Sequence, residues 1–283
     1  MRIATWNVNS LRARIGRVEA FVERHDIDVL TMQEVKATYD QVPLMGLAGL
    51  GYEVAVCGNG QWNGVAIASR VGLDDVTEGF AGQPGWGEPA APEARAVGAT
   101  CGGVRVWSLY VPNGRKPHDA HYTYKLDWMA RLREAARPWL DEPTVLTGDW
   151  NVCPTDEDVF DMSQFRNSTH VTPEERAAFA ALLDDGYAEV TRAHAPGYTY
   201  WDYYRQRFER DRGLKIDFVL ASPSVAPRVT SASIDRDERD PAERPVRLVD
   251  AAGQRKCPAA RTRTQHRLAD AHRADLRRRP QPP

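Results

Sequence analysis

The sequence predicts an α/β (α+β) fold, a four-layer α/β/β/α sandwich of two packed mixed sheets flanked by helices. Strand-like and helix-like segments alternate from residue 2 to residue 236, with no internal repeat. Several of the strand-like segments are short, β-branched and bounded by Gly or Asn, which is typical of packed sheets. A chain of 283 residues, 42% of them hydrophobic, is long enough to bury one large core.

The first half begins with a predicted strand over residues 2–8 and an amphipathic helix over 10–25, with Ser10 as its N-cap. Residues 26–35 predict a buried strand that ends in polar residues. Four short strands are predicted at 51–57, 63–70, 94–101 and 104–111. The Gly- and Pro-rich segment 78–93 is predicted to be a loop.

The second half continues with a long helix predicted over residues 121–140. Residues 143–151 predict a strand that ends in a carboxylate and an amide. A further helix is predicted over 172–186, with Thr172 as its N-cap and Pro173 at its first position. The last two predicted strands are 214–222 and 228–236.

The charge of the chain is distributed unevenly. Residues 241–283 hold 11 Lys/Arg against 4 Asp/Glu, whereas residues 1–240 hold 26 against 35, so a basic tail follows an acidic body. The four cysteines form no CxxC pair, which indicates reduced thiols and neither a disulfide framework nor a zinc site. Without a signal peptide or a long apolar run, we expect a cytoplasmic monomer with no membrane contact.

Polar side chains follow several predicted strands at the point where each strand ends. The set is Asn7, Gln33, Glu34, Tyr110, Asn113, Asp149, Asn151 and Asp217. Strand ends of packed sheets meet at one rim, so these side chains can share a cleft although a single one would be read as a turn former. Hard oxygen ligands with few His or Cys favour Mg²⁺ or Mn²⁺ over zinc. Phosphodiester cleavage is the chemistry that fits such a set.

Six motifs carry a resemblance to a known family. They are IATWNVNSLRAR, DVLTMQEVKA, WSLYVPNGR, LTGDWNVCPTDEDV, YTYWDYYRQRFERDRGLKIDFVLASPS and ASIDRDER. Together, over residues 1 to 239, the chain resembles the exonuclease III and apurinic/apyrimidinic (AP) endonuclease family of the endonuclease/exonuclease/phosphatase superfamily. The resemblance implies a catalytic domain over 1–240 that cleaves duplex DNA 5′ to abasic sites and trims blocked 3′ ends with Mg²⁺ or Mn²⁺. Residues 241–283 then form a divergent and largely disordered basic tail.

The resemblance implies a role for each matching active-site residue. Glu34 matches the principal metal ligand, with Asn7 beside it, and Asp149 and Asn151 complete the metal-binding set. Asp149 also matches the carboxylate that activates water, and Asn151 the amide that binds the phosphoryl oxygen. Their spacing of two places both side chains on one face of a strand. Tyr110 matches the active-site tyrosine, and Asp217 the aspartate that orients the catalytic histidine of the family.

The resemblance also implies the DNA contacts. Lys36 and Asn113 match contacts to the DNA backbone, which position the duplex without reading its sequence. The remaining matches are Tyr200, Trp201, Leu214 and Ile216, which fall where the family lines the pocket for an extrahelical abasic sugar. Of these, Trp201 is interpreted as a structural residue of that region.

The resemblance stops after residue 239. The family closes with a Ser-Asp-His-x-Pro motif, whose His holds the scissile phosphate and whose Asp assists the metal, followed by a buried strand. Alignment on proline places Ala242 in the Asp position and Glu243 in the His position. A carboxylate repels phosphate and cannot replace a cationic imidazole. Residues 246–249 can form the last strand, although Arg247 interrupts its apolar run.

Three interpretations of the tail remain open. The first is a shifted reading frame of GC-rich DNA, which translation in the other two frames past codon 239 tests: no Ser-Asp-His in either frame rejects it. The second is a disordered basic arm that raises DNA affinity nonspecifically. The third is an inactive, diverged paralogue.

Two further functions stay open beside the DNA-repair phosphodiesterase. One is a catalytically impaired family member that still binds DNA, and the other is a phosphodiesterase for small phosphoesters. The histidines offer no clear replacement for the missing motif. His266 and His272 lie much farther past Asp217 than the resemblance implies for the catalytic histidine. The others lie outside the matching motifs and are predicted at the solvated surface: His25, His118, His121, His170 and His194.

Overall fold

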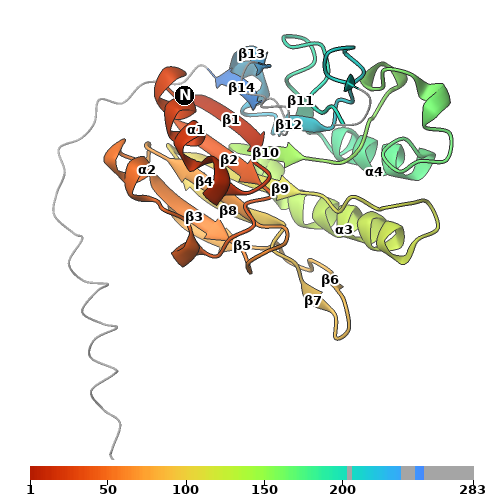
Figure 1. Cartoon of the computed structure of the whole chain (residues 1–283), viewed down its shortest axis with the longest axis horizontal. Helices are drawn as coiled ribbons and strands as arrows, with labels where there is room; N and C mark the ends of the chain where they lie inside the picture. Colours follow the sequence, from red (N-terminus) through yellow and green to blue (C-terminus); the bar gives the residue numbers. More distant parts are fainter. Residues whose placement is uncertain (203–205, 237–245, 252–283) are drawn as a thin grey trace, which may run out of the picture. The chain divides into compact units, whose positions relative to one another are not determined.

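The computed structural model describes residues 1–202, 206–236 and 246–251, the last range as backbone only. One compact unit spans Met1–Gly253. Its described part contains two six-stranded sheets and one two-stranded hairpin (Figure 1). The predicted sandwich of two mixed sheets is therefore confirmed.

Each sheet combines strands from distant parts of the chain. The first has the order β13-β14-β1-β2-β4-β3 and the second β11-β12-β10-β9-β8-β5. The bounds of the first sheet are β1 Arg2–Asn7, β2 Val29–Gln33, β3 Glu53–Cys57, β4 Val65–Ser69, β13 Val229–Asp235 and β14 Val246–Ala251. Those of the second are β5 Asp74–Glu78, β8 Ala96–Cys101, β9 Val104–Tyr110, β10 Thr144–Asp149, β11 Ala188–Glu189 and β12 Asp217–Ala221.

Each sheet contains one parallel pair whose strands are connected through a helix. In the first sheet β1 and β2 pair in parallel around α1 (Leu11–Arg24), and in the second β9 and β10 do so around α3 (Ala120–Ala136). A parallel pair requires such a crossover, because a tight turn reverses the chain direction. The two crossovers direct the carboxyl ends of all four strands toward one edge of the sandwich, which we call the site edge.

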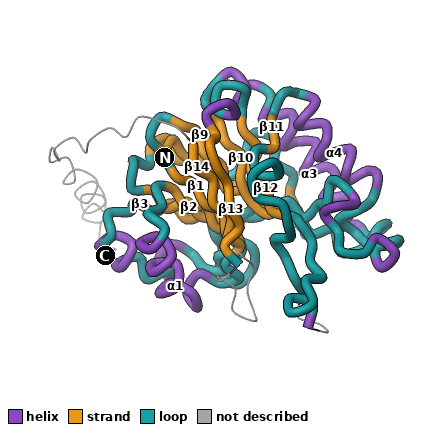
Figure 2. Tube along the Cα trace, turned by 90° about the horizontal axis from the view of Figure 1, so that it is seen from above, coloured by secondary structure: helices purple, strands orange, loops and turns teal. Residues whose placement is uncertain are grey.

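Helices cover the outer faces of both sheets, as Figures 1 and 2 show. α1 and α2 (Met45–Gly49) pack on the first sheet, where Trp6 meets Phe21 edge-on at 5.5 Å between ring centroids. α3 and α4 (Pro173–Asp184) pack on the second. The 3₁₀ helices are η1 Tyr39–Gln41, η2 Pro138–Asp141, η3 Asp156–Asp158, η4 Met162–Gln164 and η6 Ala226–Arg228.

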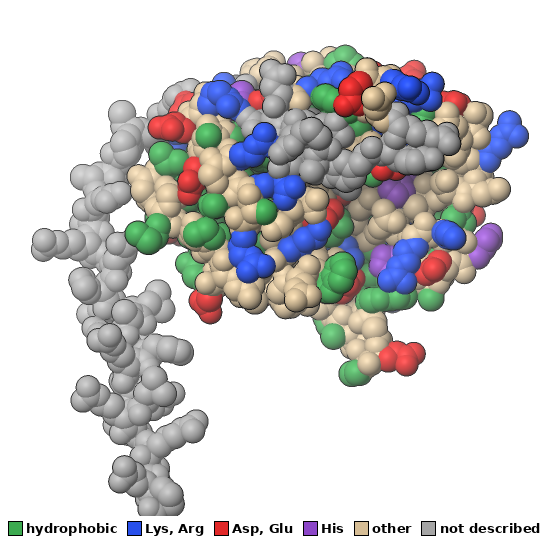
Figure 3. Space-filling view, viewed as in Figure 1, with side chains coloured by type: hydrophobic (Ala, Val, Ile, Leu, Met, Phe, Trp, Pro, Cys, Tyr) green, Lys and Arg blue, Asp and Glu red, His purple; other side chains and the backbone are tan. Residues whose placement is uncertain are grey.

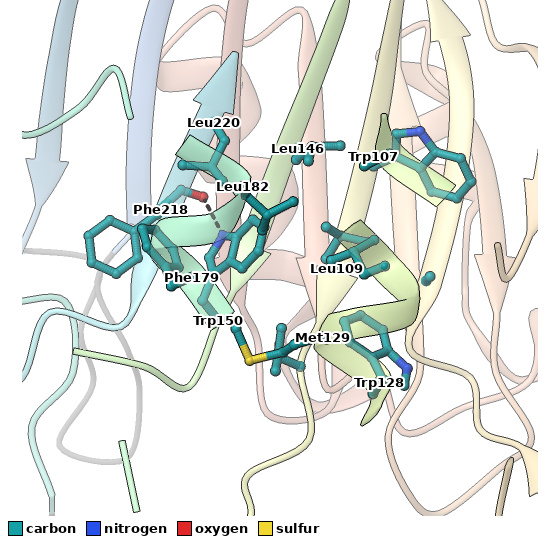
Figure 4. Close-up of a cluster of buried hydrophobic side chains, with 14 of the residues drawn as sticks. Trp107, Leu109, Trp128, Met129, Leu146, Trp150, Phe179, Leu182, Phe218 and Leu220 are labelled. Carbon is teal, nitrogen blue, oxygen red and sulfur yellow. Dashed lines mark hydrogen bonds between the residues drawn. The ribbon is translucent and has the colours of Figure 1, made fainter. Parts of the chain in front are cut away.

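The core beneath α3 and α4 is rich in large aromatic side chains (Figure 4). Trp150 follows β10 and packs edge-on against Phe179 of α4 at 5.3 Å, and its indole Nε1 donates to the Phe218 carbonyl at 3.1 Å. The indole thereby ties the end of β10 to β12 and to the helix layer. This anchor lies between two of the predicted site residues, Asp149 and Asn151.

The layer between the sheets changes in character along four strands. The inward residues, in order toward the site edge, are Ile3, Thr5 and Asn7 of β1, Val29, Thr31 and Gln33 of β2, Val106, Ser108 and Tyr110 of β9, and Val145, Thr147 and Asp149 of β10. They form an apolar row (Ile3, Val29, Val106, Val145), a hydroxyl row (Thr5, Thr31, Ser108, Thr147) and a site row (Asn7, Gln33, Tyr110, Asp149). Strand pairing keeps each row in register within a sheet.

Hydrogen bonds satisfy the buried polar groups of the middle row. Thr31 Oγ1 lies 2.7 Å from Thr147 Oγ1 of the opposite sheet. Gln33 Nε2 donates to Thr5 Oγ1 and to Ser108 Oγ, each at 3.1 Å. These contacts join the two sheets in register just before the site edge.

The structure differs from the predicted elements at Ser10 and in the segment 78–93. Ser10 precedes α1 but makes no side-chain cap bond, because its backbone is left-handed (φ 95°). The predicted loop 78–93 contains the hairpin of β6 (Gly85–Trp86) and β7 (Ala91–Pro92). The predicted N-cap of α4 is confirmed, because the Thr172 side chain accepts from the Glu175 amide.

The predicted boundary at residue 240 also differs from the structure. β14 lies beyond it and pairs with β1 and β13 inside the first sheet, so the compact unit extends to Gly253. The sheet ladder therefore continues past the point where the motif resemblance ends. In the described residues, no helix is long and apolar enough to span a membrane.

Candidate active site

Strand register places three predicted site residues in one row across the second sheet. Asp149 of β10 pairs with Tyr110 of β9 on one side and with Asp217 of β12 on the other. Residues in register project to the same face, and strands are about 4.8 Å apart, so the three side chains are neighbours. Thr199 fixes the backbone of Asp217, since Thr199 Oγ1 accepts from the Asp217 amide at 3.1 Å.

Asn7 connects this row to the first sheet. Its Nδ2 donates to Asp149 Oδ2 at 3.0 Å and to Glu34 Oε1 at 2.8 Å. One buried amide thus bridges the two carboxylates, which come from different sheets and stand 115 positions apart in the sequence. Lys36 closes the outer side through an ion pair with Glu34 at 2.9 Å.

The donor set matches what a hard divalent cation takes. Within the described ranges, no group of three or more His, Cys, Asp or Glu side chains is arranged to hold a metal. Mg²⁺ does not need such a cage, because it uses one or two carboxylates, keeps several waters and binds substrate phosphate. Glu34, Asp149 and the amide oxygens of Asn7 and Asn151 are hard oxygen donors of the kind that a divalent cation takes together with solvent and substrate.

The backbone at the site edge is left-handed at several non-glycine residues. The φ values are 53° at Glu34, 51° at Lys36, 51° at Asn151 and 82° at His170. Such conformations cost on the order of 1–3 kcal/mol each and persist only where the surroundings enforce them. They turn each side chain away from the strand direction and into the site.

A glycine allows β10 to approach β9 closely just before Asp149. Gly148 has φ 144°, and a Cβ at this position would collide with the Leu109 carbonyl. With Trp150 anchored on the other side of Asp149, the chain is fixed at both neighbours of the catalytic candidate. The Asn151 amide then folds back and donates to Asp149 Oδ1 at 3.1 Å.

Asn151 and Asn113 contact each other and a histidine. Asn113 Nδ2 donates to Asn151 Oδ1 at 3.3 Å and lies 3.4 Å from His170 Nε2, while Asn151 Nδ2 donates to the Val111 carbonyl at 2.9 Å. The surface position predicted for His170 is wrong, because the side chain is buried beside Asn113. Its position two residues before Thr172 could have indicated burial, because the N-cap of α4 fixes the end of this loop.

His121 is buried as well, contrary to the prediction. Its Nδ1 accepts from the Gly114 amide at 3.2 Å, and its ring meets Trp86 edge-on at 4.9 Å. Burial, with the charges of Arg95 and Arg115, lowers the pKa of His121 below its ordinary value. The neutral ring thereby supports the loop that carries Asn113.

Arg95 is a second residue that sequence reasoning missed. Its guanidinium lies over the Tyr110 ring, 4.8 Å from the centroid, and Nη1 donates to the Tyr110 carbonyl at 3.3 Å. Its partner Glu93 accepts from Arg95 Nε and Asn63 Nδ2. Burial alone raises the pKa of Glu93, but the Arg95 charge and these hydrogen bonds hold the pKa below its ordinary value. The signal was a charged residue inside a predicted buried strand.

The residues matched to the sugar pocket gather around one backbone pairing. Tyr200 and Leu214 exchange hydrogen bonds of 2.9 and 2.8 Å, and the Trp150 amide donates to the Ile216 carbonyl at 2.8 Å. Leu214 and Ile216 are buried with Cys153 and Val171 in one cluster, against which the half-buried Tyr200 packs. Trp201 is buried and packs against Phe208, with 5.1 Å between the ring centroids, which agrees with its interpretation as a structural residue.

The positions aligned with the missing motif, Ala242 and Glu243, lie outside the described residues, as does the tail from residue 252. The described site therefore comprises the ends of β1, β2, β9 and β10, the start of β12 and the loops that follow them.

Comparison with known proteins identifies the class. A match to the endonuclease/exonuclease/phosphatase family extends over residues 4–270. Exodeoxyribonuclease III of Haemophilus influenzae is 29% identical over 256 residues, covering 84% of this chain and 94% of that protein. The structure of the 3′ phosphatase NExo from Neisseria, bound to a product DNA hairpin, aligns with a TM-score of 0.83 and 32% identity over 89% of this chain and all of that chain. An AP endonuclease from Archaeoglobus fulgidus aligns with a TM-score of 0.81 and 30% identity, over 89% of this chain and 99% of its own.

The chain belongs to the endonuclease/exonuclease/phosphatase family. Within that family, its relatives lie in the exonuclease III and AP endonuclease branch, which confirms the resemblance carried by the six motifs.

Proposed function

We propose that this chain is a Mg²⁺-dependent DNA-repair phosphodiesterase that cleaves duplex DNA 5′ to abasic sites and removes blocked nucleotides or groups from 3′ ends. The single observation that carries the proposal is the Asn7 amide, which joins Glu34 and Asp149 across the two sheets. The names of the relatives support a DNA substrate, and the donor set supports a hard cation.

The roles of the residues follow from their contacts. A bound cation supplies Lewis-acid stabilisation of the scissile phosphate and of the leaving 3′ oxygen. Asp149 accepts the proton of the attacking water, and hydrogen bonds from Asn7 and from the Asn151 amide fix both of its oxygens. Tyr110 donates its hydroxyl to the charge that develops on the phosphate. Asn151 binds a phosphoryl oxygen.

The grip on DNA is local. On the face in view in Figure 3, the described Lys and Arg side chains are interspersed with Asp and Glu. Lys36 and Asn113 contact the DNA backbone, and the exposed Trp62 stands near Lys36, whose amide donates to the Asn63 carbonyl at 2.9 Å. Tyr200 and Leu214 form the wall against which an extrahelical sugar packs. A few placed cations and the metal offset the acidic body.

The test is cleavage of a labelled duplex that carries one tetrahydrofuran abasic-site analogue. The purified full chain is expected to cut it with Mg²⁺ and not with EDTA. Glu34→Ala abolishes cleavage, whereas the matched control Glu53→Ala, on an exposed position of β3, keeps it.

One sequence feature favours a second candidate, a family member that binds DNA without cleaving it. The segment between β13 and β14 reads RDERDPAERP and contains no Ser-Asp-His. Binding of the abasic duplex without cleavage, in Mg²⁺ and in Mn²⁺, would establish this candidate and reject the first. Hydrolysis of bis(p-nitrophenyl) phosphate with no action on the duplex would reject both in favour of a small-molecule phosphodiesterase.

A further inference from the structure

A fully buried ion pair joins α3 to α4 beside the proposed catalytic residues. Lys125 of α3 contacts Glu175 of α4, and both side chains are 0% exposed. Burial lowers the pKa of Lys125, and Glu175 opposes that shift. Burial alone raises the pKa of Glu175, but the Lys125 charge and hydrogen bonds hold the pKa below its ordinary value. The charge of each partner therefore favours the charged form of the other.

The ammonium group of Lys125 is directed at the backbone of two site residues. Its Nζ donates to the Asn151 carbonyl at 2.7 Å and approaches the Asn113 carbonyl at 3.4 Å. Asn113 and Asn151 are the two asparagines whose side chains contact each other at 3.3 Å. A single cation thus holds the peptide groups that carry both amides.

The Glu175 carboxylate organises the adjacent loop. It accepts from Thr169 Oγ1 at 2.5 Å, from Thr172 Oγ1 at 2.8 Å and from the Thr172 amide at 3.1 Å, and the His170 amide also bonds to it. Thr169 Oγ1 in turn lies 2.9 Å from the Asn113 carbonyl, and the His170 ring faces the Asn113 side chain. Both partners of the ion pair therefore converge on Asn113.

Joining the helices does not require this pair. Arg133 and Asp185 already link α3 to α4 at their other ends, with bonds of 2.6 and 2.7 Å. Replacing a buried ion pair by neutral groups is often harmless to stability. The left-handed backbone of Asn151 needs external support, which the Lys125 bond to its carbonyl supplies.

We propose that Lys125 and Glu175 are positioning residues for catalysis: together they fix the backbone of Asn113 and Asn151, so that both side-chain amides point at the substrate phosphate. The inference rests on the function proposed above for the two asparagines. Because a displacement of about 1 Å in a positioned group can reduce the rate about 100-fold, the pair controls turnover without touching the substrate.

The test compares two double variants of the full chain. Lys125→Met with Glu175→Gln removes both buried charges, and the glutamine keeps the capping box with Thr172. The control, Arg133→Met with Asp185→Asn, removes the other link between the same helices. We expect kcat on the abasic duplex to fall about 100-fold in the first variant, with KM changed by less than about 3-fold, and to stay unchanged in the control.

A second readout does not depend on activity. In protein labelled with ¹⁵N-asparagine, the side-chain amide signals of Asn113 and Asn151 are expected to shift in the first double variant and not in the control. If that variant fails to fold, Thr169→Val replaces it, since it keeps both charges and removes only the hydroxyl that contacts the Asn113 carbonyl, Glu175 and Lys125. We expect the Asn113 signal to shift and kcat to fall several-fold.

The outcomes separate the two proposals. A folded first variant with wild-type kcat and unshifted amide signals overturns the positioning role, and so does an equal loss of kcat in the control. If the wild-type chain does not cleave DNA, the proposed function fails, and the amide signals alone decide the positioning role.

Discussion

The apolar row and the site row lie on the same four strands, about 13 Å apart along each strand. Ile3, Val29, Val106 and Val145 form the apolar row, and all are at most 3% exposed. At the other end, Asn7 and Asp149 are equally buried, but they are polar, hydrogen-bonded across the sheets and followed by left-handed backbone. Apart from the half-buried Tyr110, burial is similar in both rows, and the chemistry differs.

The difference teaches that burial serves two purposes along one strand. In the apolar row, it removes hydrocarbon from water and stabilises the fold. In the site row, it lowers the local dielectric around a few paired polar groups, which strengthens their interactions and makes an unpaired group costly. The hydroxyl row lies between the two rows, so we expect a substitution in the apolar row to leave catalysis unchanged. The predictions below try to break that separation.

The largest expected effect is on the site row. Asp149→Asn removes the proton acceptor and turns one buried acceptor into a donor, so we expect kcat on the abasic duplex to fall about 10²–10⁴-fold and the unfolding free energy to fall by about 1–3 kcal/mol. Steady-state kinetics and urea unfolding measure the two. The control Asp74→Asn, exposed on β5, should match the wild type. Retained activity in the Asp149 variant would remove this carboxylate from the proposed mechanism.

The next effect lies in the apolar row. Ile3→Ala leaves a cavity between the sheets and should lower the free energy of unfolding by about 2–5 kcal/mol. Because the hydroxyl row lies between Ile3 and the site, we expect kcat at 15 °C to stay within about 2-fold of the wild-type value. Val76→Ala, on an exposed position of β5, is the control for stability. A loss of kcat as large as that of Asp149→Asn would contradict the separation of the rows.

Period-two alternation in the sequence reveals the strands and their polar last residues, as in RIATWN of β1 and TVLTGD of β10. Thr172 caps α4 through a residue three positions along the chain, whereas Gly148 is required by the Leu109 carbonyl of the neighbouring strand. The contact between Asn7 and Asp149 was inferred only from the meeting of strand ends, since no local pattern links positions so far apart.

The residues that the sequence did not reveal act over longer separations. His170 looked like a surface histidine, because only the fold brings it to Asn113, 57 positions earlier. No local pattern links Arg95 or Lys125 to its partner, because Tyr110 and Glu175 are placed by sheet register and by the packing of α3 on α4. Buried charges depend on tertiary partners, which hydrophobic periodicity does not encode.

A smaller effect is expected in the hydroxyl row. Thr31→Val and Thr147→Val each remove one side of a 2.7 Å contact between the sheets and should cost about 1–2 kcal/mol of unfolding free energy. The double variant should lose about 1 kcal/mol less unfolding free energy than the sum of the single variants, because each single variant leaves one hydroxyl without its partner and the double variant leaves none. Urea unfolding of the four proteins measures this coupling. Strict additivity would mean that the two hydroxyls do not interact.

The smallest effect on stability is expected at the mouth of the site, where the polar groups are no longer buried. Lys36 pairs with Glu34 at 2.9 Å, but the two side chains are 28% and 16% exposed, so solvent screens the pair. Lys36→Ala should therefore change the unfolding free energy by less than about 1 kcal/mol. Its effect should instead appear in DNA binding. If Lys36 contacts a phosphate, the slope of log affinity against log salt concentration decreases by about 1 in the variant. Fluorescence anisotropy of the labelled abasic duplex in Ca²⁺, between 50 and 200 mM salt, measures that slope, with Arg131→Ala on the outer face of α3 as the control cation. An unchanged slope for Lys36→Ala would mean that this lysine pairs with Glu34 and contacts no DNA phosphate.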